Sequence, residues 1–295
     1  MNSRMPIPPF QRIAIVGLGL MGGSVAKALR SNGFAGSIVG VVADAKDVRR
    51  MRPAVKRWRI SLTHVLAPAL QDADLVLLAT APHVILQQLP EVARHVSATA
   101  LVSDVASIKV PIAQLGEHLL GERFIAGHPL VGGEKTGFAA ARKRLYQGAQ
   151  VVLTPLPGRR NAALEKVRGF WEGLGATIAQ MTPEIHDNAL AATSHLPHLL
   201  AFAYMAGLEE QVAELRHLAG GGLRDFTRIG ASDPDLWADI LWENRAAVGR
   251  RLKDLQNILG DAERMLAGSD ARPLQALLAR GRICRQQFQF PPVHS

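Results

Sequence analysis

Two polar side chains in the first half of the sequence stand where proton transfer could take place. His128 lies in a Gly-His-Pro sequence directly after an apolar stretch typical of a strand, and Ser107 follows the apolar stretch before it. Ligands of open α/β sheets bind at the carboxyl ends of the strands, so both side chains are expected beside a ligand. A neutral histidine there can accept a proton near neutral pH. A capped loop histidine fits His128 equally well, and Ser107 can instead cap a helix.

A second polar group is expected on a helix in the other half of the chain. Ser194, His195 and His198 lie in a Ser-His-Leu-Pro-His sequence, and histidines three residues apart share one helix face. Together with His186 they suggest a metal site, but the spacing matches no known metal-ligand motif. The pattern therefore favours polar lining of a substrate pocket, and no metal is expected.

Charged and aromatic residues farther along the chain could complete such a pocket. Arg228 can hold a carboxylate through two parallel hydrogen bonds, which a lysine cannot do. A surface or interdomain salt bridge is the alternative, and the sequence alone slightly favours it. Trp237 can line the same pocket, although a core tryptophan is the simpler interpretation.

A glycine-rich turn near the N-terminus indicates a dinucleotide site. Residues 13–24 read Ile-Ala-Ile-Val-Gly-Leu-Gly-Leu-Met-Gly-Gly-Ser, which is a strand, a Gly-x-Gly-x-x-Gly turn and a helix start. Gly17 permits the tight turn, Gly19 lets the backbone approach a pyrophosphate, and Gly22 allows close packing of helix and strand. An ordinary strand–turn–helix is the alternative. The residues predicted to bind the cofactor are Gly17, Gly19, Leu20, Met21, Gly22, Asp44, Thr80, Pro82 and Ser107.

The elements that carry these residues follow an α/β pattern. Apolar runs alternate with helical stretches such as 23–32 and 83–96, which indicates a Rossmann-like parallel sheet covered by helices on both faces. The predicted strands are Arg12–Val16, Ser37–Val42, Leu75–Thr80, Ala100–Asp104, Phe124–Gly127, Gln150–Thr154 and Thr177–Met181.

From Pro183 onward the sequence predicts helices and no strand. Thr182 and Pro183 begin a helix that should run to Gly207 with a bend at Pro197. The sequence therefore predicts a Rossmann-like domain over residues 1–182 and an all-α domain over residues 183–295.

The remaining helices suggest a homodimer. A glycine break at 220–222 precedes a long helix that begins at Ser232 and carries apolar side chains on one face as far as Ile258. A last helix is expected over residues 273–288. An apolar face this long is difficult for a small helical half to bury alone, so we expect dimerisation through the C-terminal helices.

Composition limits the classes of protein to consider. The chain has 295 residues, of which 48% are hydrophobic, and no apolar run has the roughly 18 residues that cross a membrane. The N-terminus lacks the apolar stretch of a secretory signal, and the single cysteine, Cys284, excludes an internal disulfide, so a cytoplasmic location is expected. The net charge of +9 is dispersed, which favours a small anionic substrate over nucleic acid.

Taken in order, several motifs resemble those of prephenate dehydrogenase and its arogenate and cyclohexadienyl relatives. They are Gly-Leu-Gly-Leu-Met-Gly-Gly-Ser, Ser-Asp-Val-Ala-Ser-Ile-Lys, Gly-His-Pro-Leu-Val-Gly-Gly-Glu-Lys-Thr-Gly, His-Asp, Ser-His-Leu-Pro-His and Asp-Phe-Thr-Arg-Ile. The resemblance runs from about Arg12 to Arg280. It implies oxidative decarboxylation of prephenate or arogenate to 4-hydroxyphenylpyruvate or tyrosine, with hydride transfer to NAD or NADP, in tyrosine biosynthesis.

The resemblance also implies roles for individual residues. His128 would take the ring hydroxyl proton, Ser107 would position His128 and the nicotinamide, and Arg228 would clamp a substrate carboxylate. The side-chain end of the substrate and the pocket mouth would be lined by Ser194, His195, His198, Glu134 and Asp225.

One departure from the family leaves the choice of cofactor open. Val42 falls where NAD-using relatives often have an aspartate at the end of the second strand. Asp44 serves instead if the turn is longer; otherwise Arg49 or Arg50 could accept the 2′-phosphate of NADP. NAD is the preferred prediction.

Two other classes of protein remain as alternatives. A β-hydroxyacid dehydrogenase or imine reductase would use a residue of the helical half and would not need the Gly-His-Pro turn. A non-catalytic dinucleotide sensor would keep the glycines but would be indifferent to His128.

Overall fold

The computed structural model describes residues 10–133, 135–155 and 162–289. The chain divides into two compact units, residues 1–245 and 246–295. All residues discussed above as candidates for chemistry belong to the first unit.

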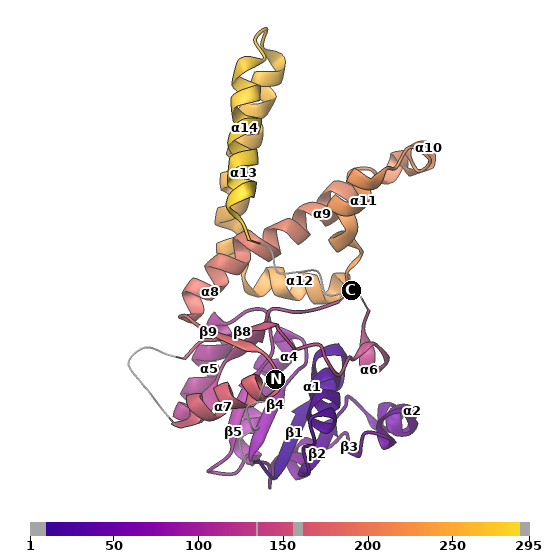
Figure 1. Ribbon diagram of the computed structural model, residues 1–295, viewed down its shortest axis with the longest axis vertical. Coiled ribbons are helices and arrows are strands. Elements are labelled where there is room, and N and C mark those ends of the chain that lie inside the picture. Colours follow the sequence, from indigo (N-terminus) through magenta and orange to yellow (C-terminus); the bar gives the residue numbers. More distant parts are fainter. Residues whose placement is uncertain (1–9, 134, 156–161, 290–295) are drawn as a thin grey trace, which may run out of the picture. The chain divides into compact units, whose positions relative to one another are not determined.

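Six strands form the first sheet, in the order β3-β2-β1-β4-β5-β6, and Figure 1 labels the first five of these. Every neighbouring pair in this order is parallel, which confirms the predicted Rossmann-like sheet. The edge strand β3 is absent from the sequence prediction, because its alternating Ile-Ser-Leu-Thr sequence lacks the continuous apolar run of the buried strands. The bounds are β1 Arg12–Val16, β2 Ser37–Val41, β3 Ile60–Thr63, β4 Leu75–Leu78, β5 Leu101–Asp104 and β6 Phe124–Ile125.

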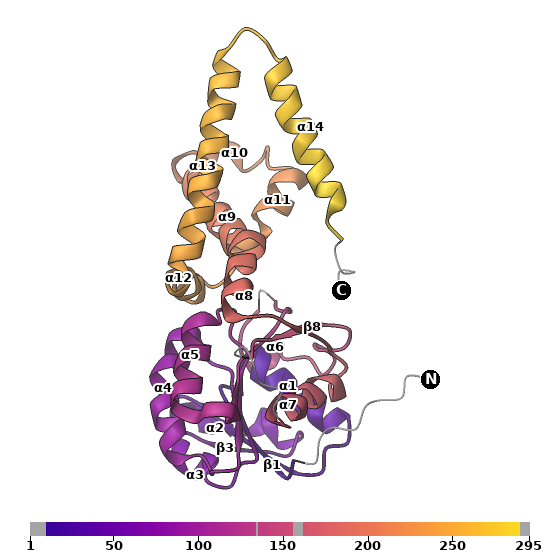
Figure 2. The same ribbon diagram turned by 90° about the vertical axis from the view of Figure 1, so that its left-hand side faces the viewer.

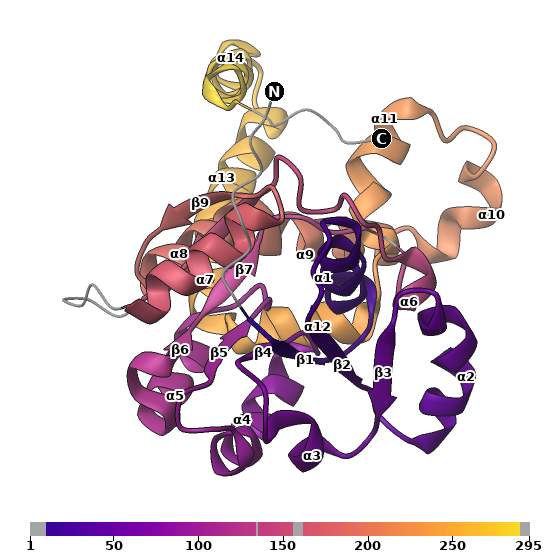
Figure 3. The ribbon, with the colours of Figure 1, turned by 60° about the horizontal axis from the view of Figure 1, so that its bottom comes forward.

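Helices cover both faces of this sheet. Figures 2 and 3 show α1 and α7 on one side, and α3, α4 and α5 on the other. Their bounds are α1 Leu20–Ser31, α3 Leu66–Leu70, α4 Pro82–His95, α5 Val110–Leu120 and α7 Ala162–Gly173. Two further helices of the first unit are α2 (Ala45–Lys56) and α6 (Gly137–Ala140).

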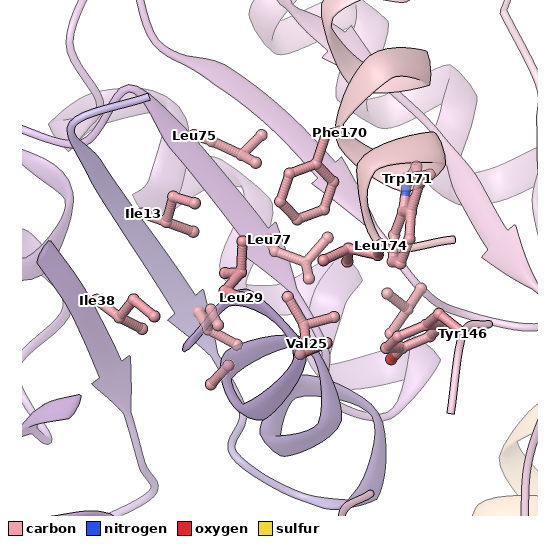
Figure 4. Packing of buried hydrophobic residues seen from close by; sticks show 14 of the residues in the cluster. Ile13, Val25, Leu29, Ile38, Leu75, Leu77, Tyr146, Phe170, Trp171 and Leu174 are labelled. Carbon is pink, nitrogen blue, oxygen red and sulfur yellow. The ribbon is translucent and has the colours of Figure 1, made fainter. Parts of the chain in front are cut away.

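Each face of the sheet has its own hydrophobic core, because successive side chains of a strand point to opposite faces. Ile13 and Ile15 belong to the core beneath α1 and α7, whereas Ala14 and Val16 belong to the core beneath α3, α4 and α5. In Figure 4, the ring of Phe170 on α7 points toward the strands, where Ile13 and other apolar side chains of the first core lie.

The later strands differ from the prediction. Gln150–Leu153 (β8) and Thr177–Gln180 (β9) lie in a separate three-stranded sheet with Gly127–Pro129 (β7), in the order β7-β8-β9. The β7–β8 pair is antiparallel and the β8–β9 pair is parallel. The expectation of one sheet is therefore wrong for these strands, and His128 lies within β7, opposite Val152, rather than in a loop after a strand.

The predicted helix from Thr182 to Gly207 is interrupted by a wider turn. It consists of α8 (Pro183–Leu190), the π-helical turn η2 (Ala191–His195) and α9 (Leu196–Ala206). Pro197 has no N–H to donate within the first turn of α9, so the break at this point has a local cause. The remaining helical segments of the first unit are η3 Glu209–Gln211, α10 Val212–Leu215, α11 Gly221–Thr227, η4 Arg228–Ala231 and α12 Pro234–Glu243, and the 3-10 turn η1 (Gly121–Arg123) precedes β6.

The single long helix predicted from Ser232 onward is instead two helices. α12 ends at Glu243, and α13 (Arg245–Ala267) begins after Asn244, whose side chain makes tertiary hydrogen bonds that its position in sequence does not reveal. α13 and α14 (Arg272–Gln287) make up the second unit. From residue 183 onward, the described part of the chain contains helices and no strand, as predicted. No described helix is long and apolar enough to span a membrane.

Candidate active site

The glycine turn has the geometry that a dinucleotide pyrophosphate requires. Gly17 has a φ of +95°, and a Cβ on Gly22 would lie 2.0 Å from the Gly17 carbonyl oxygen, so neither position accepts a side chain without a shift. A Cβ on Gly19 would meet no atom within 4 Å, which leaves open space in front of the turn. Gly19 is also the N-cap of α1 and offers no side chain to the first helical N–H groups. These N–H groups are free to bind an anion, so the residues fit a bound dinucleotide.

A cavity of about 920 Å³ begins at this turn. Gly17 and Gly19 line it together with Thr80, as does the segment Val41–Ala43 at the end of β2. Thr80 also donates a hydrogen bond to Gln88 of α4. The cavity therefore joins the ends of β1, β2 and β4, which is the edge where ligands bind in open α/β sheets.

The other predicted cofactor residues lie close to this edge. Leu20 and Met21 form the first turn of α1, and the buried Tyr146 donates a hydrogen bond to the Met21 carbonyl at 2.8 Å. Pro82 occupies the first turn of α4, while Ser107 is half-buried in the segment between β5 and α5. Asp44 is placed differently, since its side chain accepts a hydrogen bond from the N–H of Asp47 and caps α2.

His128 is the first member of a buried hydrogen-bonded network that includes His186 and Asp187 of α8. The His128 Nδ1 lies 2.8 Å from the His186 Nε2, and the His186 Nδ1 lies 2.7 Å from a carboxylate oxygen of Asp187. All three residues are less than 9% exposed. We call these three residues the histidine network.

Asp187 links the histidine network to the start of α5. Its carboxylate accepts the backbone N–H groups of Lys109 and Val110 at 2.7 and 2.8 Å, so it caps α5 from another part of the chain. An anion at a helix N-terminus satisfies N–H groups that have no partner within the helix.

The same contacts select the protonation pattern of the two imidazoles. The Asp187 carboxylate can only accept, so the His186 Nδ1 carries the proton and its Nε2 is an acceptor. The His128 Nδ1 must then donate to His186, which leaves the His128 Nε2 without a proton and able to act as a base.

Burial keeps these imidazoles neutral. It lowers the pKa of His128 well below its ordinary value, and the nearby His186 and Lys109 lower the pKa further. Burial also lowers the pKa of His186, although its hydrogen bond to Asp187 opposes the fall. His128 is therefore unprotonated, and ready to accept a proton, at neutral pH.

A buried ion pair fixes the strand that carries His128. Lys109 and Asp104 are fully buried and pair through Nζ and Oδ2. Lys109 also donates to the Gly127 carbonyl at 2.7 Å, and Asp104 accepts the Gly127 N–H at 3.1 Å. Because Asp104 ends β5, the pair ties β7 to the carboxyl edge of the first sheet.

Asn244 extends the network to His195. Its side-chain nitrogen donates to the Asp187 carbonyl at 2.8 Å and lies 3.0 Å from the His195 Nδ1. Burial lowers the pKa of His195 to about 4, against the opposing effect of Asp187. The Ser107 backbone also interacts with the His195 imidazole and opposes the fall in its pKa.

His198 of α9 and Trp237 of α12 form a second group. Their rings are stacked, with centroids 3.4 Å apart and an interplanar angle of 16°. The His198 Nδ1 donates to the Ser194 carbonyl at 2.8 Å, which makes its Nε2 the acceptor. Trp237 also packs against the second core, which agrees with the core interpretation, and its place in a substrate pocket stays a prediction.

Arg228 lies near this second group. It begins η4 and is exposed, and its charge contributes to lowering the pKa of His198, after the larger effect of burial. Asp225 is exposed on α11, where it pairs with Arg224 at 3.5 Å. Glu134, the other acid of the predicted pocket mouth, lies outside the described residues.

Five residues of these networks are absent from the set of site residues predicted from the sequence. His186 and Asp187 are adjacent polar residues, and Asp104 and Lys109 interrupt an otherwise apolar segment. Polar residues in such places are expected to be buried with hydrogen-bond partners, so the sequence did offer a sign of these two pairs. Asn244 leaves no signal, since asparagine is common at helix ends.

Comparison with known proteins gives a consistent family. The nucleotide-binding domain of prephenate dehydrogenase matches residues 25–180, and the dimerization domain of prephenate dehydrogenase matches residues 182–280. The chain is 32% identical over 240 residues to the prephenate dehydrogenase of Bacillus subtilis, covering 79% of this chain and 64% of that protein. It is 31% identical over 261 residues to the cyclohexadienyl dehydrogenase of Zymomonas mobilis, covering 87% of each.

A solved structure agrees with these sequences. The prephenate dehydrogenase of Aquifex aeolicus, in complex with hydroxyphenyl propionate and NAD+, superposes with a TM-score of 0.84 at 33% identity. The match covers 95% of this chain and 98% of that chain. With both family domains matched in order along a Rossmann-like sheet and a helical segment, the chain belongs to the prephenate dehydrogenase family.

Proposed function

We propose that this protein oxidatively decarboxylates prephenate or arogenate with NAD as the hydride acceptor, in tyrosine biosynthesis. The observation that carries the proposal is the histidine network, which leaves the Nε2 of a neutral His128 free to accept a proton. Family membership and the dinucleotide cavity support the same chemistry. The chain spans 64% of the length of its Bacillus subtilis relative, so the activity is proposed for the part in common.

In the proposed reaction, the His128 Nε2 takes the proton of the ring hydroxyl. A bound nicotinamide would supply the acceptor for the hydride that leaves the same ring carbon. The bond between the ring and its carboxylate then breaks, carbon dioxide leaves, and the electron pair of that bond moves through the ring to the oxygen. The ring becomes aromatic, and the resulting phenolate takes a proton back from the His128 imidazolium. The His186 Nε2 accepts the Nδ1–H of His128 and so steadies the imidazolium as it forms.

The remaining residues would bind and orient the two ligands. We propose that the N–H groups at the start of α1, with Gly17 and Gly19, hold the pyrophosphate. Arg228 would clamp a substrate carboxylate, and the stacked His198 and Trp237 would line the side-chain end of the pocket. Ser107 would position His128 and the nicotinamide.

The experiment is a nicotinamide absorbance assay on the purified protein, crossing prephenate and arogenate with NAD and NADP. Reduction of NAD with either substrate is the expected result. Binding of a dinucleotide without reduction in any combination would contradict the proposed reaction and would favour the sensor alternative.

We also propose that the protein is a cytoplasmic homodimer with a domain boundary at Thr182. The family domains meet between residues 180 and 182, and the second is a dimerization domain. Apolar side chains on α13 and α14 are exposed in the single chain, among them Ile258, Leu266 and Leu278. Such surface is typical of an interface. A monomeric mass by light scattering at micromolar concentration would contradict the dimer.

A further inference from the structure

The cavity wall at the end of β2 lacks the residue that usually selects between NAD and NADP. In dinucleotide-binding folds, an acid at this position accepts a hydrogen bond from the ribose 2′-hydroxyl. Here the cavity is lined at that point by Val42 and Ala43, and neither side chain can form a hydrogen bond. Another side chain must therefore contact the ribose.

Asp44 is poorly placed for this role. Its carboxylate accepts the N–H of Asp47 at 2.8 Å and serves as the N-cap of α2. Asp44 is not among the residues that line the cavity. Its side chain therefore has a structural role that needs no ligand.

Asp47 does line the cavity, from the first turn of α2. Arg50, which lines the same wall, donates to the Asp47 Oδ1 at 2.6 Å. No described residue donates to the second oxygen of Asp47, and helical side chains lean toward the helix N-terminus, here toward Val42. The Asp47 carboxylate is thus oriented by Arg50, lines the cavity, and has one oxygen to which no described residue donates.

The charges around this wall disfavour a phosphate. Among the described side chains that line the cavity, Arg50 is the one guanidinium, and it is already paired with Asp47. Glu91 of α4 adds a second negative charge to the lining. A dianionic 2′-phosphate would have to displace Asp47 from Arg50 and remain close to its carboxylate.

We propose that Asp47, oriented by Arg50, takes the place of the missing strand-end acid and selects the dinucleotide with a free 2′-hydroxyl. This inference rests on the proposed dinucleotide site. It assigns specificity to Asp47 rather than to Asp44, and it assigns Arg50 to the orientation of Asp47 rather than to a phosphate.

The test is a binding titration, which needs no turnover. NAD and NADP are titrated calorimetrically into the wild-type protein and into the Asp47→Ala and Asp44→Asn variants. The wild type should bind NAD at least about tenfold more tightly than NADP, the effect of one hydrogen bond to a charged group. Asp47→Ala should lose about tenfold in NAD affinity and gain in NADP affinity, because Arg50 becomes free to bind the phosphate.

Two further variants make the result specific. Asp44→Asn keeps a capping side chain and should leave the ratio of the two affinities unchanged. The double variant Asp47→Ala/Arg50→Ala should lose the NADP gain, while circular dichroism reports whether each variant is folded.

Three results would overturn the inference: a wild-type preference for NADP, an unchanged ratio in folded Asp47→Ala, or a change in Asp44→Asn as large as in Asp47→Ala. Selective NAD binding without oxidation of prephenate or arogenate would leave the inference standing and contradict the proposed reaction alone. Absence of any dinucleotide binding would overturn both.

Discussion

The glycine turn is built from neighbours in sequence, whereas the histidine network joins β7 to a helix 58 residues farther along the chain. In the turn, six consecutive residues give a strand end, a positive φ and a helix start. In the network, a strand of the second sheet meets α8, and α8 in turn caps α5.

The two regions also place different demands on side chains. The turn works because side chains are absent, and an added Cβ on Gly22 would collide with backbone. The network works because buried polar groups satisfy one another, so that loss of one member leaves its partners unpaired. Substitutions should therefore act by crowding in the turn and by loss of hydrogen bonds in the network.

The largest effect is expected at His128. His128→Asn should lower kcat by roughly 10²–10⁴, the usual contribution of a general base. Dinucleotide affinity should be unchanged, because the glycine turn does not depend on the network. Steady-state kinetics and a binding titration measure the two effects, with His118→Asn on the exposed side of α5 as the control. Wild-type kcat in His128→Asn would remove the proposed role.

Breaking the ion pair beneath β7 should affect stability most. Lys109→Met leaves the Asp104 carboxylate buried without its cation, which should lower the free energy of unfolding by about 3–5 kcal/mol. The exposed pair of Arg251 and Asp254 on α13 is the control, and Arg251→Met should cost less than about 1 kcal/mol. Urea unfolding measures both. Equal losses of unfolding free energy in the two variants would show that burial of the Lys109–Asp104 pair adds nothing to its contribution to stability.

Crowding the turn should separate folding from ligand binding. Gly22→Ala should cost about 1–3 kcal/mol of stability, because its Cβ would lie 2.0 Å from the Gly17 oxygen. Gly19→Ala should leave thermal stability nearly unchanged, since no protein atom lies near its Cβ, yet it should weaken dinucleotide binding. Scanning calorimetry with and without NAD distinguishes the two. Tight NAD binding by Gly19→Ala would contradict the proposed place of the pyrophosphate.

A smaller effect is expected from the far end of the network. Asp187→Asn keeps a side chain that can cap α5, but it removes the charge that orients His186, and kcat should fall roughly ten- to a hundredfold.

Wild-type kcat/KM should decline only below about pH 6.5, because the pKa of His128 is lowered from that value. Asp187 also raises the pKa of His186, so protonation of His186, which would remove the acceptor of the His128 Nδ1–H, should move to lower pH in Asp187→Asn.

The control for this variant is another helix-capping aspartate. Asp233→Asn at the start of α12 should leave the pH profile unchanged. A profile in Asp187→Asn identical to that of the wild type would limit Asp187 to a capping role.

The smallest effect is expected at Arg228. Arg228→Ala should raise the substrate KM about tenfold, by loss of a charged hydrogen bond, and leave the NAD KM within about twofold. Arg224→Ala, in the same helical segment, is the control, because Arg224 is exposed and paired with Asp225. Equal increases in both KM values would indicate a structural role for Arg228.

The sequence by itself determined the parts of the protein that depend on local pattern. Apolar runs and helix starts predicted five strands of the first sheet and the helical second half, because burial on both faces requires continuous apolar residues. The glycine turn was equally evident, since a Gly-x-Gly-x-x-Gly spacing between a strand and a helix has a local steric cause. The motif that carries His128 identified a candidate base but not its surroundings.

Only the tertiary structure decided what those surroundings are. That β7 pairs with β8 in a second sheet, and that Asp187 caps α5 while it holds His186, depend on contacts between segments far apart in the chain. Such contacts produce no periodic pattern of residues in the sequence. Each residue forms a hydrogen bond with a distant partner, and the packing of whole helices and strands sets the position of that partner. The same holds for the two aspartates of α2. Asp44 caps the helix and Asp47, three residues later, lines the cavity, because the turn of the helix decides which side chain faces the cavity.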